Sequence, residues 1–458
     1  MELMQIYRKN DLILEVIEFS PEMRERGDFL IIEDVRGDLL VQVIDMEYLE
    51  LPGLLEETIT DLPYIEIAEN GEESILLKIR DATVLKCKIR GILTDKGILT
   101  STWIPSRVHS SISHITDGEV LRYVIGDRIK RPITIGKTRF EEEVVIDAKS
   151  LDGKLTVITG KKGTGKSHLS KIILKGLLSY GAPCLVFDIN GEYVGEDTVS
   201  LTPGDTLKFT LRYVGSDSFL KILDEIYGLP SSSLWEVRRV WESLGEKITL
   251  EKLKHSIRAK SMNEHVRDAI LRRLEMIEAS RIFTDEPSEG IRIEEKIHSD
   301  RGVIVNLKGL PGVFRRMIVD LILTKIIYLL EKERIPPIFL FAEEAHTYHD
   351  EKFWEDLVTR MRHIGISLIF ITNQPDRLSE TIYRQADNVF LFNFTNENDL
   401  SFVSKASRVD SETVRSLVST LPPRYCLILG EVVGDIPIVL SVVGDTYFKS
   451  GRTKCYFD

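Results

Sequence analysis

The chain of 458 residues is 43% hydrophobic and 29% charged, a balance typical of a soluble globular protein of two or three domains. No apolar run approaches the length of a membrane span, and the charged residues near the N-terminus exclude a signal-peptide core. The formal net charge of −12 argues against a protein that coats nucleic acid but is compatible with a local basic surface, such as the lumen of a ring. The cysteines lack metal-ligand spacing, so we expect buried or incidental thiols in a reducing cytoplasm at Cys87, Cys184, Cys426 and Cys455.

Residues 1–105 consist of short strand-like segments separated by turn signals. Residues 29–46 alternate around a turn at 36–38 and predict a β-hairpin, and residues 74–103 repeat this pattern around a turn near 95–97. Several short strands at this spacing favour a small β-barrel.

Residues 155–175 predict the strand, loop and helix of a nucleotide-binding site. A β-branched apolar strand is followed by a loop of the form G-x-x-x-x-G-K-S, the Walker A pattern, and Ser167 opens a helical pattern. Such a loop points successive backbone N–H groups inward, where they cradle phosphates together with the positive end of the helix. The residues expected to contact ATP here are Gly160, Lys161, Lys162, Gly163, Thr164, Gly165, Lys166, Ser167 and His168.

Two of these residues have separate expected roles. Lys166 can reach the β- and γ-phosphates, and the Ser167 hydroxyl can ligate Mg²⁺. A chance loop of glycines and lysines is the alternative, and the strand before the loop and the helix after it make that alternative rare.

A second apolar strand, within residues 182–193, ends in Asp188 and a turn that contains Glu192. In an open α/β sheet the ligand residues lie at the carboxyl ends of the strands, so both acids are placed to line the nucleotide site. Turn formation and helix capping explain the same residues equally well.

Residues 216–283 follow a helical pattern throughout and form the most basic part of the chain. A charged helical face is usually only solvated, so direct contact with DNA is the less favoured interpretation. After this region the strands resume, and their alternation with helices over about 300 residues predicts a mostly parallel sheet with helices on both faces.

The apolar strand at 338–341 ends in two adjacent acids, Glu343 and Glu344. Acids at the carboxyl end of a buried strand are costly unless they have a role. In a P-loop enzyme we expect Glu343 to hold the Mg²⁺ shell through water and Glu344 to polarise the attacking water. The first acid is more often Asp in P-loop ATPases, and the alternative is a helix N-terminus whose dipole the acids face.

Asn373 and Gln374 close the next strand, where polar side chains can sense the γ-phosphate; a plain turn before Pro375 is the alternative. Hydrolysis also gains from a guanidinium at the γ-phosphate, which in a ring comes from the neighbouring subunit. The candidates, each of which could instead be an ordinary surface residue, are in order Arg362, Arg360 and Arg384.

The predicted architecture is an α/β fold in which a P-loop core carries additional parts. We divide the chain into an N-terminal β-barrel domain (1–105), a connector (106–150), the first part of the ATPase core (151–215), a helical insertion (216–290), and the second part of the core with the C-terminal segment (291–458).

The order of these motifs resembles that of the HerA family, archaeal hexameric DNA translocases of the HerA–FtsK group. The resemblance covers nearly the whole chain and rests on GKKGTGKS (160–167), FDINGEY (187–193), FLFAEEAH (339–346), TNQP (372–375) and LPPRYCLILG (421–430). The loop is K-G-T-G-K-S where the family usually has T-G-S-G-K-S, and the basic residue common around position 393 is replaced by Asn393.

The resemblance implies a RecA-like P-loop NTPase core preceded by a barrel like that of ATP synthase subunits. It implies a homohexamer with double-stranded DNA in its central pore, ATP and Mg²⁺ as cofactors, and a NurA-type nuclease as partner in DNA end resection. By the same resemblance, Glu343 and Glu344 form the Walker B pair, Gln374 is the sensor and Arg362 acts in trans. Two alternatives stay open: a DNA-transfer motor held at a membrane by partners, and a defence-type module with another effector.

Overall fold

The computed structural model describes residues 4–19, 24–49, 82–94, 97–101, 103–126, 129–298, 302–394, 396–406 and 410–444. The chain forms two compact units, which are described separately. The first unit comprises residues 1–147, 161–165 and 388–443, and the second comprises residues 148–160, 166–387 and 444–458. The domain boundaries expected from the sequence remain a prediction.

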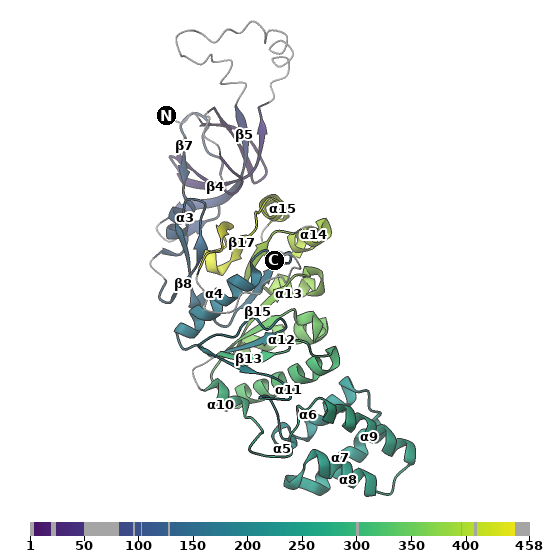
Figure 1. The fold of residues 1–458 in the computed structure, drawn as a ribbon. Helices are drawn as coiled ribbons and strands as arrows, with labels where there is room; N and C mark the ends of the chain where they lie inside the picture. Colours follow the sequence, from purple (N-terminus) through teal and green to yellow (C-terminus); the bar gives the residue numbers. More distant parts are fainter. Residues whose placement is uncertain are drawn as a thin grey trace, which may run out of the picture. The chain divides into compact units, whose positions relative to one another are not determined.

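The N-terminal part of the first unit is an antiparallel sheet of seven strands with the order β1-β2-β5-β4-β3-β7, where β6 pairs with β5 (Figure 1). The edge strands β1 and β7 lie close to each other, which makes the sheet barrel-like. The strands are β1 (Met4–Asn10), β2 (Ile13–Glu18), β3 (Phe29–Asp34), β4 (Gly37–Tyr48), β5 (Thr83–Thr94), β6 (Gly97–Leu99) and β7 (Ser111–Ile115).

Alternation of apolar and polar residues explains this sheet. Leu30 and Ile32 of β3 and Leu39, Val41 and Val43 of β4 are fully buried and belong to one apolar core. The hairpin predicted at 29–46 is confirmed, because β3 and β4 pair with Asp34 opposite Gly37. Of the second predicted hairpin, the part at 74–81 and the turn at 95–96 lie outside the described residues.

The polar stretch between Pro105 and Gly118, which we predicted to be a connector, contributes β7 to the barrel sheet by pairing with β3. The chain then enters α3 (Asp117–Val124), where Thr116 and Glu119 form a reciprocal capping box.

The rest of the first unit is a second antiparallel arrangement, in the order β16-β17-β18-β8-β9. We expected β16 and β17 to extend a parallel sheet. Two helices lie between them instead of one, and the additional reversal of the chain brings β17 back antiparallel to β16. These elements are β8 (Pro132–Lys137), β9 (Glu143–Asp147), β16 (Asn388–Phe392), α14 (Glu397–Ala406), α15 (Ser411–Ser419), β17 (Tyr425–Gly430) and β18 (Ile438–Ser441).

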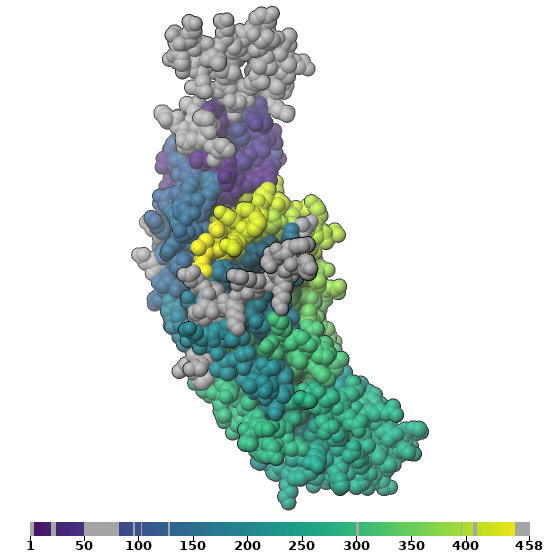
Figure 2. Space-filling model, viewed as in Figure 1, coloured from purple at the N-terminus to yellow at the C-terminus, as the bar shows by residue number. Residues whose placement is uncertain are grey.

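A buried arginine fastens the barrel to α15 within the first unit. The guanidinium of Arg90 donates to Gln42 Oε1 (3.0 Å), Thr413 Oγ1 (2.9 Å) and Asp410 Oδ2 (3.4 Å). Burial lowers the pKa of Arg90 to about 10, although Asp410 opposes this change. Figure 2 shows the C-terminal part of this unit in yellow against the purple barrel.

The second unit is built on six parallel strands in the order β12-β13-β11-β14-β15-β10. Strands β11, β14, β15 and β10 are fully buried, as expected of a sheet covered on both faces. The strands are β10 (Leu155–Thr159), β11 (Cys184–Asp188), β12 (Thr198–Leu201), β13 (Gly302–Asn306), β14 (Ile338–Glu343) and β15 (Ile366–Thr372).

Helices α4 (Lys166–Ser179), α11 (Gly312–Glu331) and α12 (Glu351–Ile364) accompany this sheet. Helix α4 packs on β10, β11 and β15, and its apolar residues are buried except Leu178, which is half-buried. Helix α12 starts at Asp350, whose side chain accepts from Phe353 N, and ends at Gly365 in the left-handed region (φ 93°) before β15 begins. No helix of the described residues has the length and apolar character that a membrane span requires.

The predicted helical insertion is confirmed as helical. It contains α6 (Ser216–Lys221), the π-helix η4 (Ile222–Ile226), α7 (Ser231–Leu244), α8 (Leu250–Ala259) and α9 (Glu264–Ala279). The last three helices pack on one another, and η4 packs on α11, where Lys221 Nζ lies 3.0 Å from Asp320 Oδ1.

The basic residues of this insertion are almost balanced by acidic ones, which our description of it as the most basic part of the chain left out. Residues 216–283 include twelve basic and eleven acidic residues. Several of the basic residues are held within the insertion by acids, with Lys254 2.6 Å from Glu278, Lys260 2.6 Å from Glu236 and Arg238 2.9 Å from Asp217. The charge count that suggested a DNA-contacting face therefore reflects internal ion pairs in large part.

We predict that Arg90→Ala lowers the free energy of unfolding by about 2–3 kcal/mol, because the buried Gln42 and Thr413 and the half-buried Asp410 lose their donor. Urea denaturation measures this change. The matched control is Arg26→Ala, since Arg26 forms an exposed pair with Asp45 and its loss should cost less than about 1 kcal/mol. Equal losses for the two variants would contradict the assigned role of Arg90.

Candidate active site

The carboxyl ends of four neighbouring strands meet at one edge of the parallel sheet. Strand pairing sets Thr159 beside Thr372, Glu343 beside Ile371, and Ala342 beside Phe187. The residues that follow each strand, which are the phosphate loop, the two glutamates and the turn after Asp188, therefore gather at this edge.

The phosphate loop has the backbone conformation that its glycines predict. Gly160 (φ 146°), Gly163 (φ 81°) and Gly165 (φ 117°) all adopt positive φ angles, which residues with a Cβ rarely adopt. Lys161, Lys162 and Gly163 are exposed, Thr164 is buried, and Ser167 and His168 are half-buried at the start of α4. The Thr164 hydroxyl donates to Lys161 O (2.7 Å) and closes the loop on itself.

Lys166 is buried at the N-terminus of α4, and its ammonium donates to Gly160 O (2.7 Å). Burial lowers the pKa of Lys166 to about 8, and the charges of Glu344 and Glu343 act in the opposite direction. The lysine and the two glutamates thus share one electrostatic environment, as the motif order predicts. A desolvated cation at a helix N-terminus is suited to bind phosphate.

Glu344 is held in an unusual conformation. It has a left-handed backbone (φ 47°), and its carboxylate accepts from Asn373 N (3.2 Å) and from Thr372 Oγ1 (3.1 Å). Burial raises the pKa of Glu344, while these hydrogen bonds and the charge of Lys166 offset part of the rise. A strained residue fixed by its neighbours at a strand end is characteristic of a catalytic position.

Glu343 is almost completely buried, and both of its oxygens accept hydrogen bonds from the turn after β11. Oε2 accepts from Ile189 N (3.0 Å) and Oε1 from Asn190 Nδ2 (3.0 Å). Burial, with a contribution from Asp188, raises the pKa of Glu343 to about 7.

The residues present fit a magnesium ion bound together with nucleotide phosphates. A buried carboxylate whose hydrogen-bond partners here are neutral donors is an environment that a cation stabilises. Each oxygen of Glu343 keeps a lone pair that can accept a hydrogen bond from water, and the Ser167 hydroxyl lies at the loop end of α4. These two residues would hold Mg²⁺, which when bound neutralises charge that develops on the phosphates.

Asp188 has the geometry of a turn-forming residue. Its Oδ1 accepts from Gly191 N (2.7 Å) and Asn190 N (3.1 Å), and its Oδ2 accepts from Tyr193 N (3.0 Å). These contacts support the structural alternative, and nucleotide binding by Asp188 remains a prediction.

The G-E-Y turn that follows Asp188 joins β11 to helix α4. Glu192 Oε2 accepts from Lys171 Nζ (3.2 Å), and the Tyr193 hydroxyl lies 2.6 Å from Ser170 Oγ. Glu192 therefore contacts the helix that carries Lys166, and its predicted contact with nucleotide is untested.

The candidate arginines lie elsewhere in the second unit. Arg362 Nη2 donates to Asp387 Oδ1 (2.5 Å), while Asp387 Oδ2 accepts from Leu155 N (2.8 Å) at the beginning of β10. Arg362 is thus at the amino edge of the sheet, roughly 20 Å from the carboxyl edge given the length of β15. Arg360 pairs with Asp356 and Arg384 with Glu380, each on its own helix.

The sensor candidate Gln374 is exposed, and its backbone N–H donates to Thr372 Oγ1 (3.0 Å). Thr372, which our sequence reasoning did not single out, donates to Glu344 and so orients the predicted catalytic acid. The available signal was its place directly before Asn373 in the T-N-Q-P motif, next to the turn. His346 was quoted only as part of a motif, and its Nδ1 lies 3.7 Å from Glu344 Oε2.

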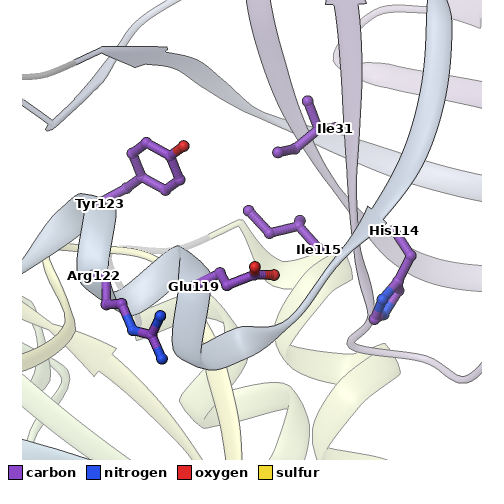
Figure 3. A pocket seen from close by; sticks show the side chains of 6 residues that line it. All are labelled: Ile31, His114, Ile115, Glu119, Arg122 and Tyr123. Atoms are coloured by element: carbon purple, nitrogen blue, oxygen red, sulfur yellow. The ribbon is translucent and has the colours of Figure 1, made fainter.

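A surface pocket of about 420 Å³ in the first unit is separate from this site. Figure 3 shows that Glu119, Arg122 and Tyr123 project from α3, whereas Ile31 and the pair His114–Ile115 come from strands β3 and β7. None of these six residues was predicted to bind nucleotide.

Comparisons with known proteins agree with the motif analysis. Residues 133–326 match the family model described as helicase HerA, central domain. The chain is 24% identical to the DNA double-strand break repair helicase HerA of Sulfolobus acidocaldarius over 461 residues, which cover 92% of this chain and 89% of the relative.

Two solved structures have a similar fold. VirB4 of Thermoanaerobacter pseudethanolicus has a TM-score of 0.55 and 17% identity, covering 69% of this chain and 98% of its own. The plasmid coupling protein TrwB, solved with a non-hydrolysable ATP analogue, has a TM-score of 0.52 and 14% identity, covering 74% of this chain and 96% of its own.

The Walker A loop, the buried lysine and the paired glutamates define a P-loop ATPase. Within that class the chain resembles HerA, because residues 133–326 match the model of the HerA central domain and most of the chain aligns with a HerA helicase, so the predicted resemblance is confirmed.

We predict that Glu343→Gln abolishes hydrolysis yet stabilises the protein without Mg²⁺ at pH 8. The pKa of Glu343 is raised from 4.5 to about 7. Ionisation of Glu343 therefore lowers the free energy of unfolding progressively between these two pH values, and the full loss is present above the higher one. The gain should be roughly 1–3 kcal/mol at pH 8 and vanish near pH 4.5, as measured by thermal denaturation at both pH values. A gain that is independent of pH would contradict the buried charge.

We also predict that Thr372→Val lowers kcat about tenfold and leaves the KM for ATP nearly unchanged, because Glu344 loses an orienting hydrogen bond but the phosphate loop is untouched. Steady-state kinetics separates the two parameters. Thr359→Val is the control, since the Thr359 hydroxyl bonds only to Glu355 O within α12 among the hydrogen bonds that the structure describes. A matching loss in both variants would exclude this role for Thr372.

Proposed function

We propose that this protein is a ring-forming ATP-driven motor that translocates on double-stranded DNA. The ATPase site supplies the energy, and the similarity to HerA along 92% of the chain supports DNA as the track. Contacts to DNA would be mainly to phosphates, so binding would be salt-sensitive and weakly sequence-specific.

The observation that carries the proposal is the convergence of Lys166, Glu343 and Glu344 at one sheet edge. The phosphate loop and Lys166 would bind ATP, and Ser167 and Glu343 would hold Mg²⁺. Glu344, oriented by Thr372 and by Asn373 N, would accept a proton from the attacking water. Gln374, at the adjacent strand end, is proposed as the γ-phosphate sensor.

Arg362 is proposed to act on the site of a neighbouring subunit. Its position at the amino edge of the sheet, beside Asp387, keeps it away from the loop of its own chain. A homohexamer, with each site completed by the next subunit, satisfies this geometry. An arginine supplied in this way typically raises hydrolysis by about 10³-fold or more.

By resemblance to HerA, we further propose that the ring acts in the cytoplasm with a NurA-type nuclease in DNA end resection. The alternatives are a DNA-transfer motor and a defence-type module. DNA-stimulated ATP hydrolysis with duplex unwinding and association with a nuclease would favour repair. Stable association with a membrane channel or with a non-nuclease effector would favour one of the other two.

We predict that Lys166→Ala abolishes ATP hydrolysis, by at least about 100-fold, while the fold is retained. Hydrolysis is measured by phosphate release with and without duplex DNA, and folding by circular dichroism. The control Lys332→Ala, an exposed lysine at the end of α11, should be unaffected. Near-normal hydrolysis by Lys166→Ala would refute the site.

Mixing of subunits tests the trans arginine. Arg362→Ala and Lys166→Ala are each expected to be inactive as pure proteins, but mixed rings would contain some sites with an intact loop beside an intact arginine. Hydrolysis should therefore reappear as the two proteins are combined at varied ratios. If no ratio restores activity, Arg362 does not act between subunits.

A further inference from the structure

The phosphate loop is held from outside by a segment near the C-terminal end of the described chain. Arg424 N donates to Thr164 O (3.0 Å), and Lys161 N donates to Asn393 O (2.9 Å). Asn393 Nδ2 also donates to Leu421 O (2.6 Å), three residues before Arg424, and so links Asn393 to the segment that carries the second anchor. Both ends of the exposed loop are thus tied to backbone that lies more than 200 residues further along the chain.

Arg424 makes its contact in a strained conformation. Its φ angle is +70°, in the left-handed region that residues with a side chain seldom occupy. The strain persists because its backbone is fixed at both ends: Arg424 N bonds to Thr164 O, and Arg424 O accepts from Val442 N (2.8 Å). Non-glycine residues in this region concentrate at functional sites.

Packing at Gly165 shows how closely this segment approaches the loop. A Cβ on Gly165 would lie 3.2 Å from Phe392 Cε1 and 3.6 Å from Arg424 Cα. Gly165, which precedes the phosphate-binding lysine, therefore has two roles. It adopts a positive φ that other residues disfavour, and its lack of a side chain leaves room for β16 and the 421–424 segment.

We infer that Asn393 and Arg424 are positioning residues that preset the phosphate loop for nucleotide, and that Arg424 acts through its backbone. Two hydrogen bonds fix the carbonyl of Thr164 and the N–H of Lys161, so fewer loop conformations compete with the one that binds phosphate. Asn393 stands where a basic residue is expected. Its neutral side-chain amide donates to Leu421 O, while its backbone carbonyl accepts from Lys161 N of the loop.

A substitution series at Arg424 separates backbone from side chain. Arg424→Gly and Arg424→Ala both keep the N–H; glycine adopts the left-handed conformation freely, and alanine adopts it at about the same cost as the arginine, so their KM for ATP should stay within about twofold of the original protein. Arg424→Val should raise KM about tenfold with a smaller effect on kcat, because a β-branched residue disfavours this conformation. Equilibrium binding of a fluorescent ATP analogue should weaken in parallel with KM.

The same measurements can overturn the inference. If Arg424→Gly and Arg424→Ala lose as much affinity as Arg424→Val, the guanidinium and not the backbone is responsible. If all three variants bind ATP normally, the segment does not position the loop. Melting temperatures identify a variant that is unfolded, and if Arg424→Val is unfolded, the Asn393 variant described next decides whether the segment positions the loop.

Asn393 provides an independent test. Asn393→Ala removes the hydrogen bond to Leu421 O and should raise KM about fivefold, whereas the exposed Asn398→Ala in α14 should not change it. An unchanged KM in Asn393→Ala would show that the link between Asn393 and Leu421 is dispensable.

Discussion

The parallel pairing of β10, β15 and β14 is the constraint on which the whole site depends. Backbone hydrogen bonds in this register set the start of the phosphate loop beside Thr372 and set Glu343 one strand further along. Lys166 and Glu344, 178 positions apart in the chain, consequently influence each other's charge. The chemical roles assigned to these side chains require a rigid sheet edge. The three strands are fully buried, and close packing around them keeps this edge rigid.

Much of this arrangement could be predicted, because the relevant signals are local. The glycine spacing of the loop, the apolar strand before it and the acid pair at the end of β14 all lie within short windows, and the parallel-sheet rule brings them together. The direction of β17 could not be predicted from its apolar pattern, since an extra helix reverses the chain. Thr372 escaped notice because a threonine at a strand end is also an ordinary β-branched strand residue.

Hydrogen bonds and short stretches of chain connect the phosphate loop to the barrel within the first unit. Arg90 of β5 binds Asp410 at the start of α15, and the chain after this helix leads to Leu421 and Arg424. Those residues reach the loop directly or through Asn393. None of these pairings is visible in the sequence, because each joins residues that are tens to hundreds of positions apart. A partner that binds the barrel would thus have a continuous packed route to the loop.

The bond between Arg362 and Asp387 has a further consequence if Arg362 serves a neighbouring subunit. The phosphates there would compete with Asp387 for one guanidinium, and Asp387 also holds the first residue of the strand that leads into its own Walker loop. When ATP occupies one site, the Asp387 carboxylate of the subunit that supplies Arg362 would lose its ion-pair partner, at the beginning of the strand that leads to that subunit's own Walker loop. In such a ring, ATP binding at one site would be coupled electrostatically to the strand that leads into the Walker loop of the neighbouring subunit.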